Sequence, residues 1–379
     1  MADATRLRVM GVSLPAVSDY RQPLPRGKWS QFFGALAERV DLVGIARPAM
    51  RRRDRAALLA RHIHPDRGTW RARAGFDVAG VAKLDASLQR QLNARRDPAD
   101  LIVQLQTLCS PRGAGVRGPY VIYTDNTMAL TQRVYPRWAP LTVSGVDRWQ
   151  RFEAGVCHEA ARVFTFSEFA RRSVIEDYGC PPDQVVAIGA GANQMVASVE
   201  GRDYTQRRAL FVGHPFDLKG GPVLLEAWPL VRRRLPDAEL VLAGPKTDPA
   251  PSFGEGVVWR GWLGREELAV LYQTSTAFVL PSMFDAWGHV LVEAMAHGLP
   301  CIGNDICAMP ELIADGVSGR LVDRGDPEQL AAAIVEVLSD PETARRMGQA
   351  GHARALAELT WPAVIQRLMS SVAELGLAA

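Results

Sequence analysis

The sequence predicts an α/β protein made of two Rossmann-like domains, and three features lead to that prediction. Short apolar runs typical of buried parallel strands alternate along most of the chain with segments of helical periodicity. At 379 residues the chain is long for one hydrophobic core and suits two domains. The segment from Phe278 to Pro300 has the order strand, glycine loop, helix, which turns free backbone N–H groups toward an anion.

The composition is that of a globular protein, with 47% hydrophobic and 22% charged residues. No apolar run approaches the roughly 20 residues that span a bilayer. The first ten residues lack an apolar signal region, so we expect a cytoplasmic protein, with a peripheral position at the inner membrane face as the alternative. The five cysteines form no C-x-x-C pair, which argues against a disulfide framework and against a structural zinc site.

Charge is unevenly distributed along the chain. Residues 1–200 contain 28 lysines and arginines against 19 acidic residues, whereas residues 201–379 contain 16 against 22. The basic half favours an anionic partner there, such as a phosphorylated acceptor or an acidic membrane surface. General solubility in an arginine-rich protein explains the excess equally well. No nucleic-acid partner is expected, and the oligomeric state cannot be read from the sequence.

The amino-terminal half begins with a strand, helix and strand in the order of a Rossmann-like domain. Its first loop has no G-x-G-x-x-G, so dinucleotide binding gains no support. Ser167 is a suitable N-cap for the helix that follows it. We expect strands at 7–12, 40–45, 101–105, 120–123, 163–166 and 185–188, and helices at 29–39, 51–61, 70–94 and 168–179.

Two polar segments of this half allow a functional and an ordinary interpretation. Asp125 and Asn126 follow the strand at 120–123, at the sheet edge where open α/β sheets bind ligands, although Asp125 also suits the start of a turn. His62, His64 and Asp66 are metal-ligand types, but a third ligand and a defined scaffold are missing, so we do not favour a metal there. The helix at 70–94 is most simply core-facing, and with the preceding arginines the alternative is a membrane surface.

The carboxyl-terminal half contains a glycine loop, GHPFDLKGG at 213–221, directly before a helix that starts near Pro222. Lys219 in this loop is one of only four lysines against 40 arginines, and it lies where a cation and free N–H groups would hold a diphosphate. The loop at 244–246 follows another strand and is expected near a nucleotide base. We expect strands at 209–212, 239–243, 257–262, 278–280 and 301–303, and helices at 266–272, 289–297, 326–338, 341–359 and 361–375.

Two carboxylates frame the helix start within the Phe278–Pro300 segment. Asp285 precedes Gly288, and Glu293 lies one turn inside the helix, which ends at Gly298. Carboxylates beside a phosphate would repel it, so they more plausibly accept hydrogen bonds from neutral sugar hydroxyls. Acidic groups next to anion-binding amides therefore indicate a nucleotide sugar.

The phrase D-A-W-G-H-V-L-V-E-A-M-A-H-G-L-P, residues 285–300, resembles the acidic signature of the retaining glycosyltransferases of family 4. That family has glutamate where this chain has Asp285, and an arginine where it has His214. The resemblance covers nearly all of residues 150–375. It implies the GT-B fold, two Rossmann-like domains facing each other across a cleft: an acceptor-side domain at 1–198, a nucleotide-sugar domain at 199–360, and a final helix at 361–379 that crosses back.

The resemblance also implies roles for individual residues. Glu293 would bind the ribose hydroxyls and Asp285 the donor sugar, while Lys219 and His214 would hold the diphosphate; Lys219, Asp285 and Glu293 form the expected catalytic set. Asp125 and Asn126 would contact the sugar or the acceptor. The remaining donor-binding residues would be Gly213, Gly244, Gly288, His289, Val290 and Leu291.

The implied activity is transfer of a hexosyl group from a nucleotide sugar to an acceptor with retention of configuration. The donor, a UDP- or GDP-sugar, is a substrate, and neither a cofactor nor a metal is expected, since the chain has no Asp-x-Asp. Front-side attack, in which the leaving phosphate accepts the acceptor's proton, needs no dedicated protein base. The alternatives are a nucleotide-sugar epimerase and a non-catalytic protein that binds nucleotide or glycan.

Overall fold

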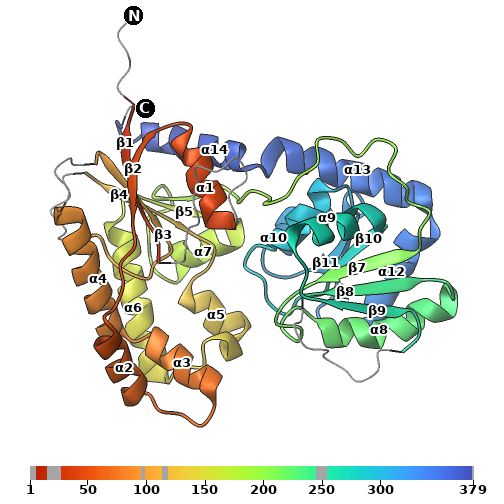
Figure 1. The fold of residues 1–379 in the computed structure, drawn as a ribbon, viewed down its shortest axis with the longest axis horizontal. Coiled ribbons are helices and arrows are strands. Elements are labelled where there is room, and N and C mark those ends of the chain that lie inside the picture. The colour runs from red at the N-terminus through yellow and green to blue at the C-terminus, as the bar shows by residue number, and fades with distance from the viewer. Residues whose placement is uncertain (1–5, 15–26, 95–98, 113–117, 245–253, 378–379) are drawn as a thin grey trace, which may run out of the picture. The chain divides into compact units, whose positions relative to one another are not determined.

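The computed structural model describes residues 6–14, 27–94, 99–112, 118–244 and 254–377. The chain divides into two compact units: unit 1 comprises Met1–Gly189 and Val364–Ala379, and unit 2 comprises Ala190–Ala363. Each unit contains a six-stranded parallel sheet covered by helices (Figure 1). The prediction of two Rossmann-like domains is therefore confirmed.

In unit 1 the strands are arranged in the order β2-β1-β3-β4-β5-β6. Because β2 and β3 flank β1 on opposite sides, the direction of winding reverses between β1 and β3. That reversal is the topological switch point at which open sheets leave a crevice beside the carboxyl ends of their strands. The strands are β1 (Arg8–Val12), β2 (Asp41–Ala46), β3 (Leu101–Leu105), β4 (Tyr120–Thr124), β5 (Arg162–Thr165) and β6 (Val185–Ala187).

Helices cover both faces of this sheet, with α4 and α6 packed together on one face and α1 on the other (Figure 1). The last helix, α14, begins in unit 2 and continues into unit 1. The helices are α1 (Lys28–Ala37), α2 (Arg52–Arg61), α3 (Arg67–Gly75), α4 (Val78–Asn93), α5 (Met128–Val134), the 3-10 turn η1 (Pro136–Trp138), α6 (Val143–Glu159), α7 (Glu168–Glu176) and α14 (Trp361–Ala373).

The single helix expected at 70–94 is wrong, because the structure has two helices there. Asp77 ends the first and caps the second: its carboxylate accepts a hydrogen bond from the Ala79 amide at 2.8 Å. Aspartate competes in this way with helix continuation and favours a new N-terminus. By contrast, Ser167 is the N-cap that the sequence predicts, and its hydroxyl accepts from the Ala170 amide at 3.1 Å.

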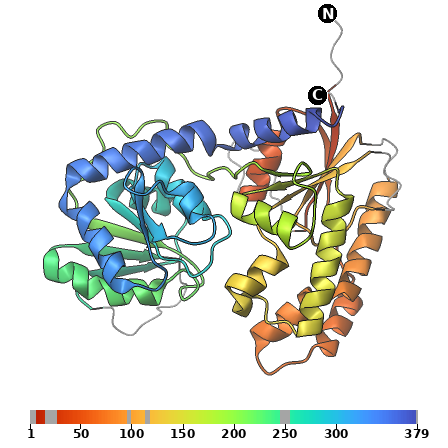
Figure 2. The ribbon, with the colours of Figure 1, turned by 180° about the vertical axis from the view of Figure 1, so that it is seen from behind.

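In unit 2 the order is β12-β11-β10-β7-β8-β9, and the winding reverses between β7 and β10. Helices α8 and α12 pack together on one face, with α9 and α10 on the other (Figure 2). The strands are β7 (Arg208–Val212), β8 (Glu239–Ala243), β9 (Val257–Gly261), β10 (Ala277–Leu280), β11 (Cys301–Asn304) and β12 (Gly319–Val322). The helices are α8 (Gly221–Arg234), α9 (Arg265–Thr274), α10 (His289–Ala296), α11 (Met309–Leu312), α12 (Pro327–Ser339) and α13 (Pro341–Glu358).

In the part of the chain that the structure describes, no helix is both long and apolar enough to cross a membrane.

Candidate functional site

Both switch points collect polar side chains at the carboxyl ends of their central strands. In unit 2 these side chains are Lys219, which follows β7, and Asp285, which follows β10. In unit 1 they are Lys28, Gln106 and Asp125, which follow β1, β3 and β4 in turn. At a switch point the chain leaves the two neighbouring strands in opposite directions, so a crevice in which ligands bind remains outside their carboxyl ends. Each unit therefore has its own candidate site, and the two are described separately.

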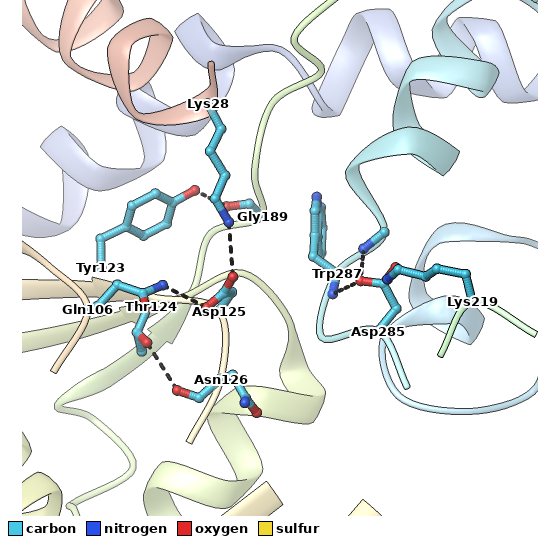
Figure 3. Close-up of polar contacts among 11 residues, drawn as sticks. Lys28, Gln106, Tyr123, Thr124, Asp125, Asn126, Gly189, Lys219, Asp285 and Trp287 are labelled. Carbon is cyan, nitrogen blue, oxygen red and sulfur yellow. Dashed lines mark hydrogen bonds and ion pairs between the residues drawn. The ribbon is translucent and has the colours of Figure 1, made fainter. Parts of the chain in front are cut away.

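In unit 2, Lys219 and Asp285 form a close ion pair. The Nζ–Oδ2 distance is 2.6 Å, and the two side chains are only 17% and 15% exposed. Figure 3 shows the ammonium directed at the carboxylate. The structure thus brings two of the predicted site residues into contact. The lysine that the sequence assigns to a diphosphate is thus held in place by the carboxylate assigned to a sugar.

The two loops that supply this pair are joined through their backbones. The Met283 amide donates to the carbonyl of Leu218 at 2.8 Å, and the Ser282 hydroxyl donates to the same carbonyl at 3.2 Å. Gly220 has φ +77°, and a Cβ atom there would lie 1.7 Å from the carbonyl oxygen of Pro281. Only glycine permits this approach. The Lys219 loop is therefore positioned by the Asp285 loop before any ligand arrives.

Asp285 also organises the start of α10. Its Oδ1 accepts from the Gly288 amide at 2.8 Å and from the Trp287 amide at 3.3 Å (Figure 3), while Gly288 adopts φ +88° as the N-cap residue. The Leu291 amide donates to the Gly288 carbonyl at 2.9 Å. Of the four amides expected at an anion, those of Gly288 and Leu291 thus donate within the protein.

Glu293 lies beneath this helix start and is 6% exposed. Its Oε1 accepts from Nδ2 of Asn193 at 2.9 Å, and its Oε2 accepts from the hydroxyl of Tyr272 at 3.3 Å. Burial raises the pKa of the Glu293 carboxyl, and these hydrogen bonds together with the charge of Arg265 only partly oppose that rise. Asn193 was not predicted as a partner of Glu293, because it lies in the glycine-rich segment at 189–193, a hundred residues earlier in the chain.

The remaining described residues predicted to bind the donor have no hydrogen bond or ion pair with the carboxylate of Asp285. His214 is exposed and its ring lies 6.3 Å from that of Trp262, so its imidazole is not part of the Lys219–Asp285 pair. Gly213 and Gly244 lie against each other: a Cβ on Gly244, at φ +119°, would be 2.5 Å from the Gly213 carbonyl oxygen. This contact explains Gly244 without a ligand, and Gly213 is explained by Lys219, whose Cβ would lie 2.7 Å from a Cβ at position 213. Residues 245 and 246 of the expected base-side loop lie outside the described residues.

In unit 1, Asp125 is held from two sides. Nζ of Lys28 lies 3.1 Å from its Oδ2, and Nε2 of Gln106 donates to its Oδ1 at 2.8 Å (Figure 3). The three residues converge from the ends of different strands, which places Asp125 at the predicted edge of the sheet. Lys28 and Gln106 were not predicted as site residues. The rarity of lysine in this chain was the one sequence signal that could have indicated Lys28.

Two residues of this cluster adopt positions that are locally unfavourable. Lys28 opens α1, where the helix dipole disfavours a cation, yet its ammonium lies 4.5 Å from the Trp29 ring and 5.3 Å from the Phe166 ring. Gln106 has φ +65°, a left-handed conformation that costs a non-glycine residue about 1 kcal/mol or more. Strain of this kind concentrates at functional sites.

Asn126 has a different position from Asp125. Its Nδ2 donates to the hydroxyl of Thr131 at 2.7 Å, and its backbone carbonyl accepts from the Thr124 hydroxyl at 3.1 Å. Its Oδ1 is buried and has no hydrogen-bond partner among the described residues. A buried amide oxygen without a donor is costly, so it is a place where a ligand hydroxyl would be stabilised.

In the segment at 62–66, which contains residue types that bind metals, His62 and Asp66 each contact other parts of the protein. His62 Nε2 lies 2.6 Å from Oδ2 of Asp77, and Asp66 caps α3 by accepting from the Thr69 amide at 2.6 Å. Within the described ranges, no three histidine, cysteine or acidic side chains are grouped as metal ligands would be.

Comparison with known proteins adds sequence and structural relatives. Residues 197–354 match the family model described as "Glycosyl transferases group 1". The alpha-maltose-1-phosphate synthase of Mycolicibacterium smegmatis is 30% identical over 200 residues, which cover 47% of this chain and 51% of that protein. The D-inositol 3-phosphate glycosyltransferase of Segniliparus rotundus is 28% identical over 241 residues, covering 58% and 53%. The chain thus spans about half the length of the curated relatives it matches.

Solved structures resemble the chain over nearly its whole length. The sucrose-phosphate synthase from Thermosynechococcus elongatus aligns with a TM-score of 0.72 at 18% identity, covering 99% of this chain and 100% of that one. Anabaena HepE, solved with UDP and glucose, aligns with a TM-score of 0.67 at 15% identity, covering 97% and 100%. At such identities the likeness establishes the fold.

Proposed function

We propose that the chain is a family-4 glycosyltransferase, and that it transfers a hexosyl group from a nucleoside diphosphate sugar to an acceptor with retention of configuration and without a metal ion. The observation that carries the proposal is the Lys219–Asp285 pair at the switch point of unit 2. It combines a cation suited to a leaving diphosphate with a carboxylate suited to sugar hydroxyls.

The pair suggests how the donor is bound. A diphosphate has more negative charge than one carboxylate, so it would compete for the Lys219 ammonium and release Asp285 toward the sugar hydroxyls. Lys219 would then stabilise the charge that develops on the leaving group as the glycosidic bond breaks. His214 is assigned to the outer part of the diphosphate and Glu293 to the ribose. The UDP and UDP-glucose complexes of HepE make UDP-sugars the first donors to test.

For the acceptor we propose the unit 1 cluster. Asp125, held by Lys28 and Gln106, would accept a hydrogen bond from an acceptor hydroxyl and orient its oxygen. Asn126 would donate to or accept from a neighbouring hydroxyl. Since a front-side mechanism hands the proton to the leaving phosphate, Asp125 is assigned to positioning and not to general base catalysis.

The test is donor turnover by wild type and Lys219→Ala. Purified protein in EDTA is incubated with UDP-, GDP- and ADP-sugars, and release of free nucleotide is measured together with the stabilisation that each nucleotide confers. We expect slow hydrolysis of one nucleotide class, reduced at least about a hundredfold in the variant, as found when single charge-stabilising donors are removed. Lys83→Ala, which removes an exposed lysine on α4, is the matched control.

Near-normal turnover by a folded Lys219→Ala protein would refute the role of Lys219. Stabilisation by no nucleotide would refute the donor site. Hydrolysis only after a divalent ion is added back would refute metal independence.

A further inference from the structure

Unit 1 contains a polar cavity of about 200 Å³, which is lined by α2, α3 and the starts of α4 and α6. Figure 1 shows α2 and α3 together at the lower end of this unit. Three arginines line the cavity, Arg61, Arg73 and Arg148, together with His62 and a single acidic residue, Asp77. None of these residues takes part in the acceptor cluster at Asp125.

The one carboxylate of the cavity is already engaged by neighbouring groups. Oδ2 of Asp77 lies 2.6 Å from Nε2 of His62 and 3.8 Å from a guanidinium nitrogen of Arg61, and its Oδ1 accepts from the Ala79 amide at the start of α4. Its negative charge is therefore balanced before a ligand enters. The guanidinium groups of Arg73 and Arg148 add positive charge that Asp77 does not offset.

The wall contributed by α6 adds to this positive character. Arg73 Nε donates to the carbonyl of Pro140 at 3.1 Å, which holds its guanidinium on the cavity wall. Thr142, the N-cap of the 17-residue α6, and Gly145 in its first turn also line the cavity, so the positive end of that helix dipole faces it. Several guanidinium groups around one small space match a doubly charged anion better than a single carboxylate.

The volume limits what the cavity can hold. A water molecule takes about 30 Å³ of liquid, and sites for whole small-molecule ligands begin at roughly 300 Å³. We propose that this cavity binds a phosphate ester group, with the rest of the ligand outside it. Ile63, which lines the cavity, is 76% exposed, and Val143, next to the lining residue Thr142, is 89% exposed. A soluble phosphorylated molecule and a phospholipid headgroup both satisfy this chemistry.

Binding can be measured without turnover, which keeps this proposal independent of the transferase activity. Wild-type protein is titrated calorimetrically with inorganic phosphate and with sn-glycerol 3-phosphate, and is sedimented with vesicles of phosphatidylglycerol and phosphatidylcholine. The test variant is Arg61→Gln/Arg148→Gln, in which both side chains are exposed. The control is Arg52→Gln/Arg55→Gln, which removes the same charge from exposed positions of α2 outside the cavity.

We expect at least one probe to bind wild type and to bind the test variant about tenfold more weakly, with the control close to wild type. Binding of the soluble phosphates supports a free phosphate ester as the ligand, and binding of the vesicles alone supports a headgroup. Absence of binding to every probe overturns the proposal. Equal losses in the two double variants also overturn it, because they mean general electrostatic attraction.

Discussion

The Lys219–Asp285 pair makes a quantitative prediction that a double-mutant cycle can test. The perturbations are Lys219→Met, Asp285→Asn and the combination of both. Methionine keeps most of the lysine stem, and asparagine keeps an oxygen that accepts from the Gly288 amide, so each change mainly removes one charge. The cycle therefore isolates the interaction between the ammonium and the carboxylate.

The expected magnitude follows from distance and burial. Two unit charges 2.6 Å apart attract by about 1.6 kcal/mol in bulk water and about 6 kcal/mol at an effective dielectric constant of 20. Exposed pairs contribute about 1 kcal/mol or less, and removing one partner of a fully buried pair costs about 3–5 kcal/mol. With side chains 17% and 15% exposed, each single variant should lose about 2–3 kcal/mol of unit 2 stability, with a coupling of about 2 kcal/mol.

The assay is amide hydrogen exchange in increasing urea, read by mass spectrometry from peptides of β7 and α10, which reports unit 2 by itself. The double variant should be little less stable than either single variant, since it leaves no charge unpaired whereas each single variant leaves one. A coupling below about 0.5 kcal/mol would refute the reasoning. It would mean that solvent screens the pair as it screens surface pairs, and that Asp285 does not position Lys219 for a diphosphate.

Three further predictions concern buried or constrained positions. Gly220→Ala should lower the free energy of unfolding, measured by thermal unfolding, by more than about 3 kcal/mol, because the new Cβ meets the Pro281 carbonyl. Gly201→Ala, at a residue with a similar φ but open space around it, should lower it by about 1 kcal/mol. Equal losses in the two variants would contradict this prediction. The buried Glu153 carboxyl accepts hydrogen bonds from the Met128 amide and from the hydroxyls of Thr107 and Tyr178. Glu153→Leu should therefore lower the free energy of unfolding in urea by about 3–5 kcal/mol, and Glu153→Gln should lower it clearly less. Equal losses in the two variants would count against this role of the carboxyl. The raised pKa of Glu293 means that the folded state binds the proton of this carboxyl more tightly than the unfolded state does. The free energy of unfolding should therefore fall as the pH rises above the ordinary pKa of 4.5, and it should fall less in Glu293→Gln. Urea midpoints of the wild type and the variant that change in parallel between about pH 4 and pH 7 would exclude this effect.

The sequence by itself determined the elements whose signals are local. Strands recur as short apolar runs because both faces of a parallel sheet are buried, and the predicted strand at 101–105 coincides with β3. Helix ends followed from capping chemistry, as at Ser167 and at Gly298, whose φ of +76° ends α10. Helix α6 was missed because its buried face includes Glu153, which interrupts the apolar pattern.

For the candidate site, the sequence predicted Lys219 as a rare lysine in a glycine loop and Asp125 from its place after a strand, and the resemblance to family 4 implied the roles of Asp285 and Glu293. Only the tertiary structure decided which of them are partners. It paired Lys219 with Asp285, which are 66 positions apart, and brought Lys28 to Asp125 across 97. Such contacts depend on the order in which strands are placed in the sheet, and that order is set by packing of the whole unit and not by any local pattern.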